Sequence, residues 1–114
     1  MPIEGCVMTD KSISGLQKAI DQWITSNGGY WDEMSLLARL TEEIGELARE
    51  YNHQFGAKKK KSSEPEGNLA GELADILWLV MCMANQQGID LETAFEGVME
   101  KLRVRDAGRF SEST

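Results

Sequence analysis

Two pairs of acidic residues, each one helical turn apart, lie beside apolar stripes and constrain this chain more than any other feature. The first pair is Glu43 and Glu46, and the second is Glu72 and Asp75. A carboxylate near an apolar core costs free energy unless a cation meets it. If the pairs face each other across a cavity, a hard divalent cation relieves their repulsion, and Mg²⁺ is the common one. Such a site most often handles phosphates, because the metal can bridge carboxylate and phosphate.

The bulk properties of the chain predict a single small domain, residues 1–114, in the cytoplasm. The net charge of −7 argues against a nucleic acid or an anionic membrane as the main partner. The longest apolar stretch, residues 76–84, is too short to span a bilayer. The first residues lack the basic and apolar regions of a signal peptide, and Cys6 and Cys82 show no metal or redox spacing.

Apolar residues recur with a helical period nearly throughout the chain, and neither a strand pattern nor an internal repeat is present. The pattern predicts an all-α fold, a four-helix bundle with a core of about residues 14–106. The expected helices cover about 14–26, 32–54, 68–87 and 91–106. The expected irregular segments are an N-terminal arm (1–9), a solvated loop (57–66) and a frayed tail (108–114). On the fourth helix, Phe95, Val98 and Leu102 should point inward.

The third predicted helix is apolar on nearly all sides between residues 76 and 84. Trp78 lies on the side away from Ile76 and Val80, and a helix apolar on several faces needs neighbours on several faces. Four helices in one chain do not supply enough of them. The sequence therefore predicts a homo-oligomer that packs through this helix and completes the bundle.

The placement of Glu72 separates a metal site from a solvated helix face. Glu42, Glu43 and Glu46 could form an ordinary solvated face, since glutamate favours helices. Glu72 instead falls within an apolar stripe, where an unpaired carboxylate does not belong. The combination favours the metal site.

The pattern Glu-Glu-x-x-Glu, followed by Glu-x-x-Asp after a spacer, resembles that of the all-α nucleotide pyrophosphohydrolases. This superfamily includes MazG, the dimeric dUTPases, the dCTP pyrophosphatases and phosphoribosyl-ATP pyrophosphatase. Residues 38–50, which contain the first motif, are similar in detail to the short single-domain MazG-like proteins. The resemblance covers about residues 16–109, and the two motifs together are far more specific than either alone.

The resemblance implies Mg²⁺-dependent hydrolysis of a nucleoside or deoxynucleoside triphosphate to the monophosphate and pyrophosphate. Mn²⁺ is a possible substitute, and a house-cleaning role in the nucleotide pool is expected. Family members usually assemble as dimers or as tetramers built from dimers. By motif, Glu43, Glu46, Glu72 and Asp75 match the metal-binding carboxylates. Glu42 and Glu43 are the expected catalytic pair, because Glu42 matches the glutamate that binds a further metal or orients the attacking water.

A negative pocket that binds a negative substrate also needs cations. The resemblance assigns phosphate contacts to Lys101, Arg105 and Arg109, although cations at a helix end could equally be solvated. Pyrimidine-specific relatives have Asn at or near Arg105, which puts a pyrimidine-specific activity in doubt. Tyr30, Trp31 and His53 are candidates for contacts with the base. Trp23 and Trp78 are expected to pack in the core or at an interface.

Two other classes of protein fit parts of the pattern. A di-iron carboxylate bundle would use Glu50 and His53, which form one Glu-x-x-His motif where such a site needs two. A symmetric dimer could supply the second. A non-catalytic helical interaction module would leave the acidic residues as a solvated face and would show no stabilisation by a specific metal.

Overall fold

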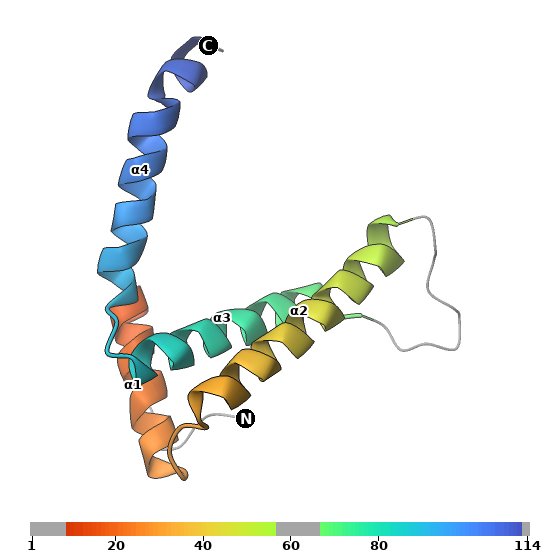
Figure 1. Cartoon of the computed structure of the whole chain (residues 1–114), viewed down its shortest axis with the longest axis vertical. Helices are drawn as coiled ribbons and strands as arrows, with labels where there is room; N and C mark the ends of the chain where they lie inside the picture. The colour runs from red at the N-terminus through yellow and green to blue at the C-terminus, as the bar shows by residue number, and fades with distance from the viewer. Residues whose placement is uncertain (1–8, 57–66, 113–114) are drawn as a thin grey trace.

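The computed structural model describes residues 9–56 and 67–112, with the backbone alone for residues 107–112. This part of the chain is all-α, without a strand, as the helical period predicts. The predictions for residues 1–8, for the 57–66 loop and for residues 113–114 concern residues outside this part. The helices, drawn in Figure 1, are α1 (Ile13–Ser26), α2 (Glu33–Phe55), α3 (Leu69–Gln86) and α4 (Leu91–Glu112). None of these helices is long and apolar enough to cross a membrane.

Short polar side chains set the beginnings of the first three helices. Ser12, Asp32 and Asn68 are the N-caps, and each side chain accepts a hydrogen bond of 2.9–3.0 Å from the backbone N–H three residues later. Such a cap satisfies an amide that has no partner within the helix. Between α1 and α2 the chain turns at Gly28 and Gly29, whose φ angles of 105° and 86° are rare for other residues.

The core lies where α1 crosses the antiparallel pair formed by α2 and α3 (Figure 1). Ile24, Leu36, Leu79 and Cys82 form its buried cluster. Partly buried side chains surround the cluster: Ile20, Trp23, Tyr30, Leu40 and Met83. The core is therefore concentrated at one end of the α2–α3 pair, which holds these two helices in register further along.

A buried glutamine joins α1 to the end of α3 and the beginning of α4. The amide nitrogen of Gln17 donates to Asn85 Oδ1 and to the carbonyl oxygen of Ile89, each at 2.9 Å. Its amide oxygen accepts from the backbone N–H of Leu91, also at 2.9 Å. Because these bonds reach three elements, they fix the point from which α4 leaves the rest of the fold.

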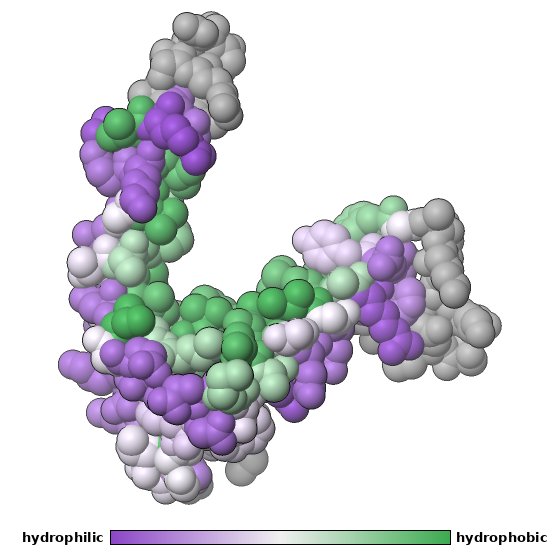
Figure 2. Space-filling model, viewed as in Figure 1, coloured by the Kyte–Doolittle hydropathy of each residue, from purple (hydrophilic) through white to green (hydrophobic). Residues whose placement is uncertain are grey.

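Helix α4 packs against α1 near its beginning and then projects away from the other helices (Figure 1). The prediction that its apolar face points inward is wrong within one chain: Phe95 is 53% exposed, and Val98 and Leu102 are exposed too. Figure 2 shows the reason, since apolar surface follows the concave side between α4 and the α2–α3 pair, with none of the four described helices over it. The bundle is open in a single chain.

The end of α4 also differs from the prediction. The helix continues to Glu112, where the sequence predicted an end near Asp106 and a frayed tail from Gly108. A single glycine costs a helix interior about 1 kcal/mol, which does not suffice to end it. Proline and a suitable capping turn are stronger stop signals, and the sequence from 107 to 112 has no proline.

Candidate active site

Three of the predicted carboxylates meet between α2 and α3. Glu43 and Glu46 come from the middle of α2, and Glu72 comes from the first turn of α3. One carboxylate oxygen from each lies within 4.8 Å of the other two. Oxygens that share one Mg²⁺ at about 2.1 Å per bond lie at most about 4.2 Å apart. The three side chains are thus close to the spacing that a small divalent cation requires.

Asp75 lies at the edge of this group. Its side chain is exposed and is not one of the three that converge. It borders the same cavity as Glu43, and its charge contributes to the raised pKa of Glu72. Asp75 is therefore near enough to act on the site electrostatically, one helical turn beyond Glu72.

Two buried oxygen atoms of the group have no hydrogen-bond partner among the described residues. They are Oε2 of Glu43 and Oε2 of Glu72. The side chain of Glu43 is only 6% exposed, so water does not solvate it freely. Burying a carboxylate oxygen without a partner is unfavourable, and a bound cation removes that cost. These two oxygens fit a divalent metal better than a solvated helix face.

The environment of Glu72 disfavours its charged form. Burial of the carboxyl group is the largest cause of its raised pKa, followed by the negative charges of Glu46, Glu43 and Asp75. Desolvation and like charges both favour the protonated acid. A cation bound among these groups would offset the repulsion between the negative charges and would lower the pKa of Glu72 again. This is what we expect of a metal site.

Arg39, which the sequence reasoning missed, lies beside this group. Its Nε atom is 3.1 Å from Oε1 of Glu43, one helical turn further along α2. Its Nη1 atom is 3.9 Å from Oε2 of Glu42, whose side chain is 67% exposed. The i,i+4 spacing of Arg39 and Glu43 is visible in the sequence and could have indicated the ion pair.

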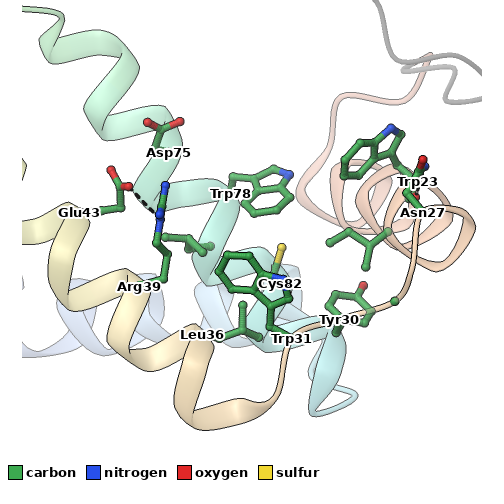
Figure 3. Close-up of a pocket in the computed structure, with 13 residues that line it drawn as sticks. Trp23, Asn27, Tyr30, Trp31, Leu36, Arg39, Glu43, Asp75, Trp78 and Cys82 are labelled. Atoms are coloured by element: carbon green, nitrogen blue, oxygen red, sulfur yellow. Dashed lines mark hydrogen bonds and ion pairs between the residues drawn. The ribbon is translucent and has the colours of Figure 1, made fainter.

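A cavity of about 390 Å³ opens next to the carboxylates. In Figure 3, Glu43 and Asp75 lie at one end, Trp23 and Tyr30 lie at the other, and Trp78 is between them. The full lining comprises Trp23, Ile24, Asn27, Gly29, Tyr30, Trp31, Leu36, Arg39, Glu43, Asp75, Trp78, Leu79 and Cys82. An aromatic wall that continues into an acidic end suits a ligand with a flat apolar part and a charged part.

The structure brings only some of the predicted base-contacting residues to the cavity. Trp31 borders the cavity, whereas His53 is not among its lining residues. Trp23 and Trp78, which the sequence assigned to packing, both line it. They come from α1 and α3, so their meeting depends on how those helices cross, which no local pattern reveals.

Tyr30 forms part of the same wall and is held in place. Its hydroxyl group donates to Asp21 Oδ1 at 2.7 Å. Burial, together with this hydrogen bond, raises the pKa of Tyr30 to about 12. Tyr30 is therefore a neutral, fixed side chain at any physiological pH.

The cations on α4 are not brought to the carboxylates within one chain. Lys101 and Arg105 border a separate shallow groove with Glu100 and Val104, and this groove shares no residue with the cavity. Arg105 instead pairs with Asp106 at 3.1 Å. The side chain of Arg109 is outside the described part of the chain.

Residues 32–110 match the model of the MazG nucleotide pyrophosphohydrolase domain, and this range contains the acidic group between α2 and α3. The chain belongs to the MazG family. It is thereby a hydrolase that acts on acid anhydrides. Members of this family generally depend on a divalent metal, which agrees with the acidic group between α2 and α3.

Proteins from Bacillus are similar over nearly their whole length. The uncharacterized protein YpjD of Bacillus subtilis (strain 168) is 41% identical over 105 residues, which is 91% of this chain and 95% of YpjD. The crystal structure of YpjD, a pyrophosphatase candidate, has a TM-score of 0.72 and 42% identity, covering 82% of this chain and 97% of that one. A Bacillus-conserved MazG protein, a nucleotide pyrophosphohydrolase, has a TM-score of 0.69 and 43% identity, covering 83% and 93%.

These findings bear on the two other classes that the sequence left open. The chain belongs to a family of enzymes, so it is not a non-catalytic helical interaction module. Among the described residues, the group with metal-binding spacing contains neither Glu50 nor His53. Three carboxylates without histidine are the donors that Mg²⁺ and Mn²⁺ prefer, so this group gives no support to a di-iron site.

Proposed function

We propose that the protein hydrolyses nucleoside or deoxynucleoside triphosphates, canonical or modified, to the monophosphate and pyrophosphate with Mg²⁺. Mn²⁺ would be a functional substitute. The observation that carries this proposal is the convergence of Glu43, Glu46 and Glu72 in a MazG-family chain, with two buried oxygens that lack a partner in the described part of the chain. The family defines the type of reaction, and the donor set favours a hard divalent cation.

The carboxylates would divide the work between holding the cation and activating water. Glu43, Glu46 and Glu72 would bind the cation, and Asp75 would complete the set from the cavity edge. When bound, the metal supplies Lewis-acid neutralisation of the phosphate charge and a template for the substrate. Glu42 is exposed next to Glu43 and would orient the attacking water and accept its proton.

Water would attack the α-phosphorus and displace pyrophosphate. The water oxygen then forms the new bond to phosphorus, and the bond between the α-phosphorus and the bridging oxygen breaks. The bridging oxygen leaves with pyrophosphate, so oxygen from the solvent is retained in the nucleoside monophosphate. The carboxylate geometry fits cleavage at either anhydride, and the family supports this one.

The aromatic cavity would hold the base. Trp31 borders it together with Trp23 and Trp78, and flat aromatic walls stack on any nucleobase. Asn27 is the uncharged polar side chain at the same end and could bond to a base edge. His53 does not line this cavity, so we retain Trp31 and not His53 as a base-contacting residue.

A second copy of the chain would complete the enzyme. The apolar face of α4 is exposed, and so are Leu73 and Leu77 on α3. Exposed apolar surface of this extent is typical of an interface, which supports a dimer or a tetramer built from dimers. Lys101, Arg105 and Arg109 lie on α4, which projects away from the α2–α3 pair (Figure 1), so their proposed phosphate contacts would be made with a neighbouring subunit.

The biological setting follows from these proposals. One domain spanning residues 1–114, located in the cytoplasm, would remove unwanted nucleotides from the pool. Nucleic acid and membrane would not be partners, in line with the net charge of −7.

Pyrophosphate and phosphate release, measured across canonical and modified nucleotides with Mg²⁺, tests the proposed reaction. We expect pyrophosphate in equimolar amount to the monophosphate, and Glu72→Gln should abolish turnover while the circular dichroism spectrum stays helical. Glu33→Gln is the matched control, because Glu33 is an exposed glutamate at the beginning of α2. In ¹⁸O-labelled water, label confined to pyrophosphate would exclude attack at the α-phosphorus.

A further inference from the structure

One cationic side chain lies between the aromatic wall and the carboxylates. Among the described residues that line the cavity, Arg39 is the only lysine, arginine or histidine. Figure 3 shows its guanidinium group beside Glu43, below Asp75. A ligand that spans the cavity from the base end to the acidic end must pass this group.

The resting contact of Arg39 is with a carboxylate that the proposed cation would use. Its Nε atom lies 3.1 Å from Glu43 Oε1. A guanidinium group and a divalent cation compete for the same negative charge, so binding of the cation weakens this ion pair. The Arg39 side chain is 48% exposed and already borders the cavity, so a change of partner does not require it to leave a buried position.

The substrate carries several negative charges into a site that is already acidic. Within one chain, the α4 cations Lys101 and Arg105 border a different groove. Guanidinium groups bind phosphate through two parallel hydrogen bonds, a geometry that lysine does not reproduce. Arg39 is thus both in the right place and of the right chemistry to contact a phosphate.

We propose that Arg39 is a phosphate-binding residue that exchanges partners during the reaction cycle. It neutralises Glu43 while the metal site is empty, and it contacts the nucleotide phosphate once a divalent cation takes over Glu43. This inference rests on the proposed function, because it requires a nucleotide in the cavity. It adds a phosphate contact from within the chain that holds the carboxylates.

Binding measurements without turnover test the proposal. The probe is the α,β-methylene analogue of whichever nucleotide the wild type hydrolyses fastest, titrated calorimetrically with Mg²⁺ present. We expect Arg39→Met to weaken analogue binding about tenfold to hundredfold, since a lost hydrogen bond to a charged group has about this effect. Arg39→Lys should recover only part of the affinity. Lys18→Met, which removes an exposed charge from α1, should bind like the wild type.

Two further titrations separate a phosphate contact from other roles. The corresponding nucleoside, which lacks phosphate, should bind Arg39→Met and wild type equally. Mn²⁺ alone should bind Arg39→Met at least as tightly as wild type, because a competing cation has been removed from Glu43. Weaker Mn²⁺ binding, or an equal loss of nucleoside binding, would show that Arg39 organises the site and would overturn the proposal.

The outcomes also distinguish this inference from the function on which it rests. A wild type that binds and hydrolyses nucleotides, with an Arg39→Met variant whose analogue affinity stays within twofold, overturns the inference alone. A wild type that binds no nucleotide in the presence of Mg²⁺ overturns the function and the inference together. If Arg39→Met does not fold, Arg39→Lys and Arg39→Gln provide the same comparison.

Discussion

Replacing Gln17 with leucine should destabilise the fold through the loss of one buried polar junction. The Gln17 side chain is 7% exposed and makes three hydrogen bonds of 2.9 Å, to Asn85, Ile89 and Leu91. Leucine is close to glutamine in size, so it introduces little cavity. It leaves the acceptors on Asn85 and Ile89 and the N–H donor of Leu91 without their partner. Each lost hydrogen bond costs about 1 kcal/mol of stability, and more where water cannot replace it.

The expected total is therefore about 3 kcal/mol of unfolding free energy. For a domain near 100 residues, 1 kcal/mol shifts Tm by about 4–8 °C, so Gln17→Leu should lower Tm by about 12–24 °C. Thermal and urea unfolding followed by circular dichroism at 222 nm measure both quantities. The effect on α4 should appear as a greater sensitivity of the region around Leu91 to proteolysis.

Gln22→Leu is the matched control, since it makes the same change at an exposed position of α1. It should stay within about 0.5 kcal/mol of the wild type, as surface substitutions usually do. If Gln17→Leu also stays within that range, the hydrogen bonds do not fix α4 as argued above, and the position of α4 must depend on packing alone.

Three further predictions address the site, the assembly and the buried thiol. The pKa of Glu72 is raised above its ordinary value of 4.5, so the folded state holds the carboxyl proton more tightly than the unfolded state does. The stability of the metal-free chain should therefore fall as the pH rises through the raised pKa. Glu72→Gln should flatten that pH dependence in chemical unfolding experiments. Leu77, an exposed apolar residue on α3 that does not line the cavity, tests the assembly. Leu77→Glu should weaken assembly and lower activity together, checked by light scattering and pyrophosphate release; a variant that dissociates but keeps full turnover would contradict this. Burial raises the pKa of Cys82 to about 11, so in a Cys6→Ser background iodoacetamide at pH 8 should label the folded chain far more slowly than the urea-unfolded chain.

The helices and the acidic group were predictable because their signals are local. The caps at Ser12 and Asp32 and the spacing of Glu43 and Glu46 can be read within a few residues of sequence. Glu72 was predictable as a functional residue because an unpaired carboxylate within an apolar stripe is unfavourable. These features depend on helix geometry alone, which the sequence encodes directly.

Other features depend on how the helices are arranged, and local patterns do not contain that information. Trp23 and Trp78 meet around a cavity because α1 crosses α3, although each resembles an ordinary packing residue in its own helix. The apolar face of α4 was correctly recognised, but the sequence cannot say whether its partner is in the same chain. The spacing of Arg39 and Glu43 is local, but the position of Arg39 beside the cavity depends on how α2 packs against α3.

Calorimetric titration of Mg²⁺ and Mn²⁺ into the nucleotide-free protein tests most directly whether the carboxylates between α2 and α3 form a metal site. Wild type and the Glu33→Gln control should bind the cation alike, and Glu43→Gln and Glu72→Gln should each lose most of the affinity. Each of these two variants removes one of the three converging carboxylates. Undiminished Mn²⁺ binding by both Glu43→Gln and Glu72→Gln would contradict the assignment of the metal to this group.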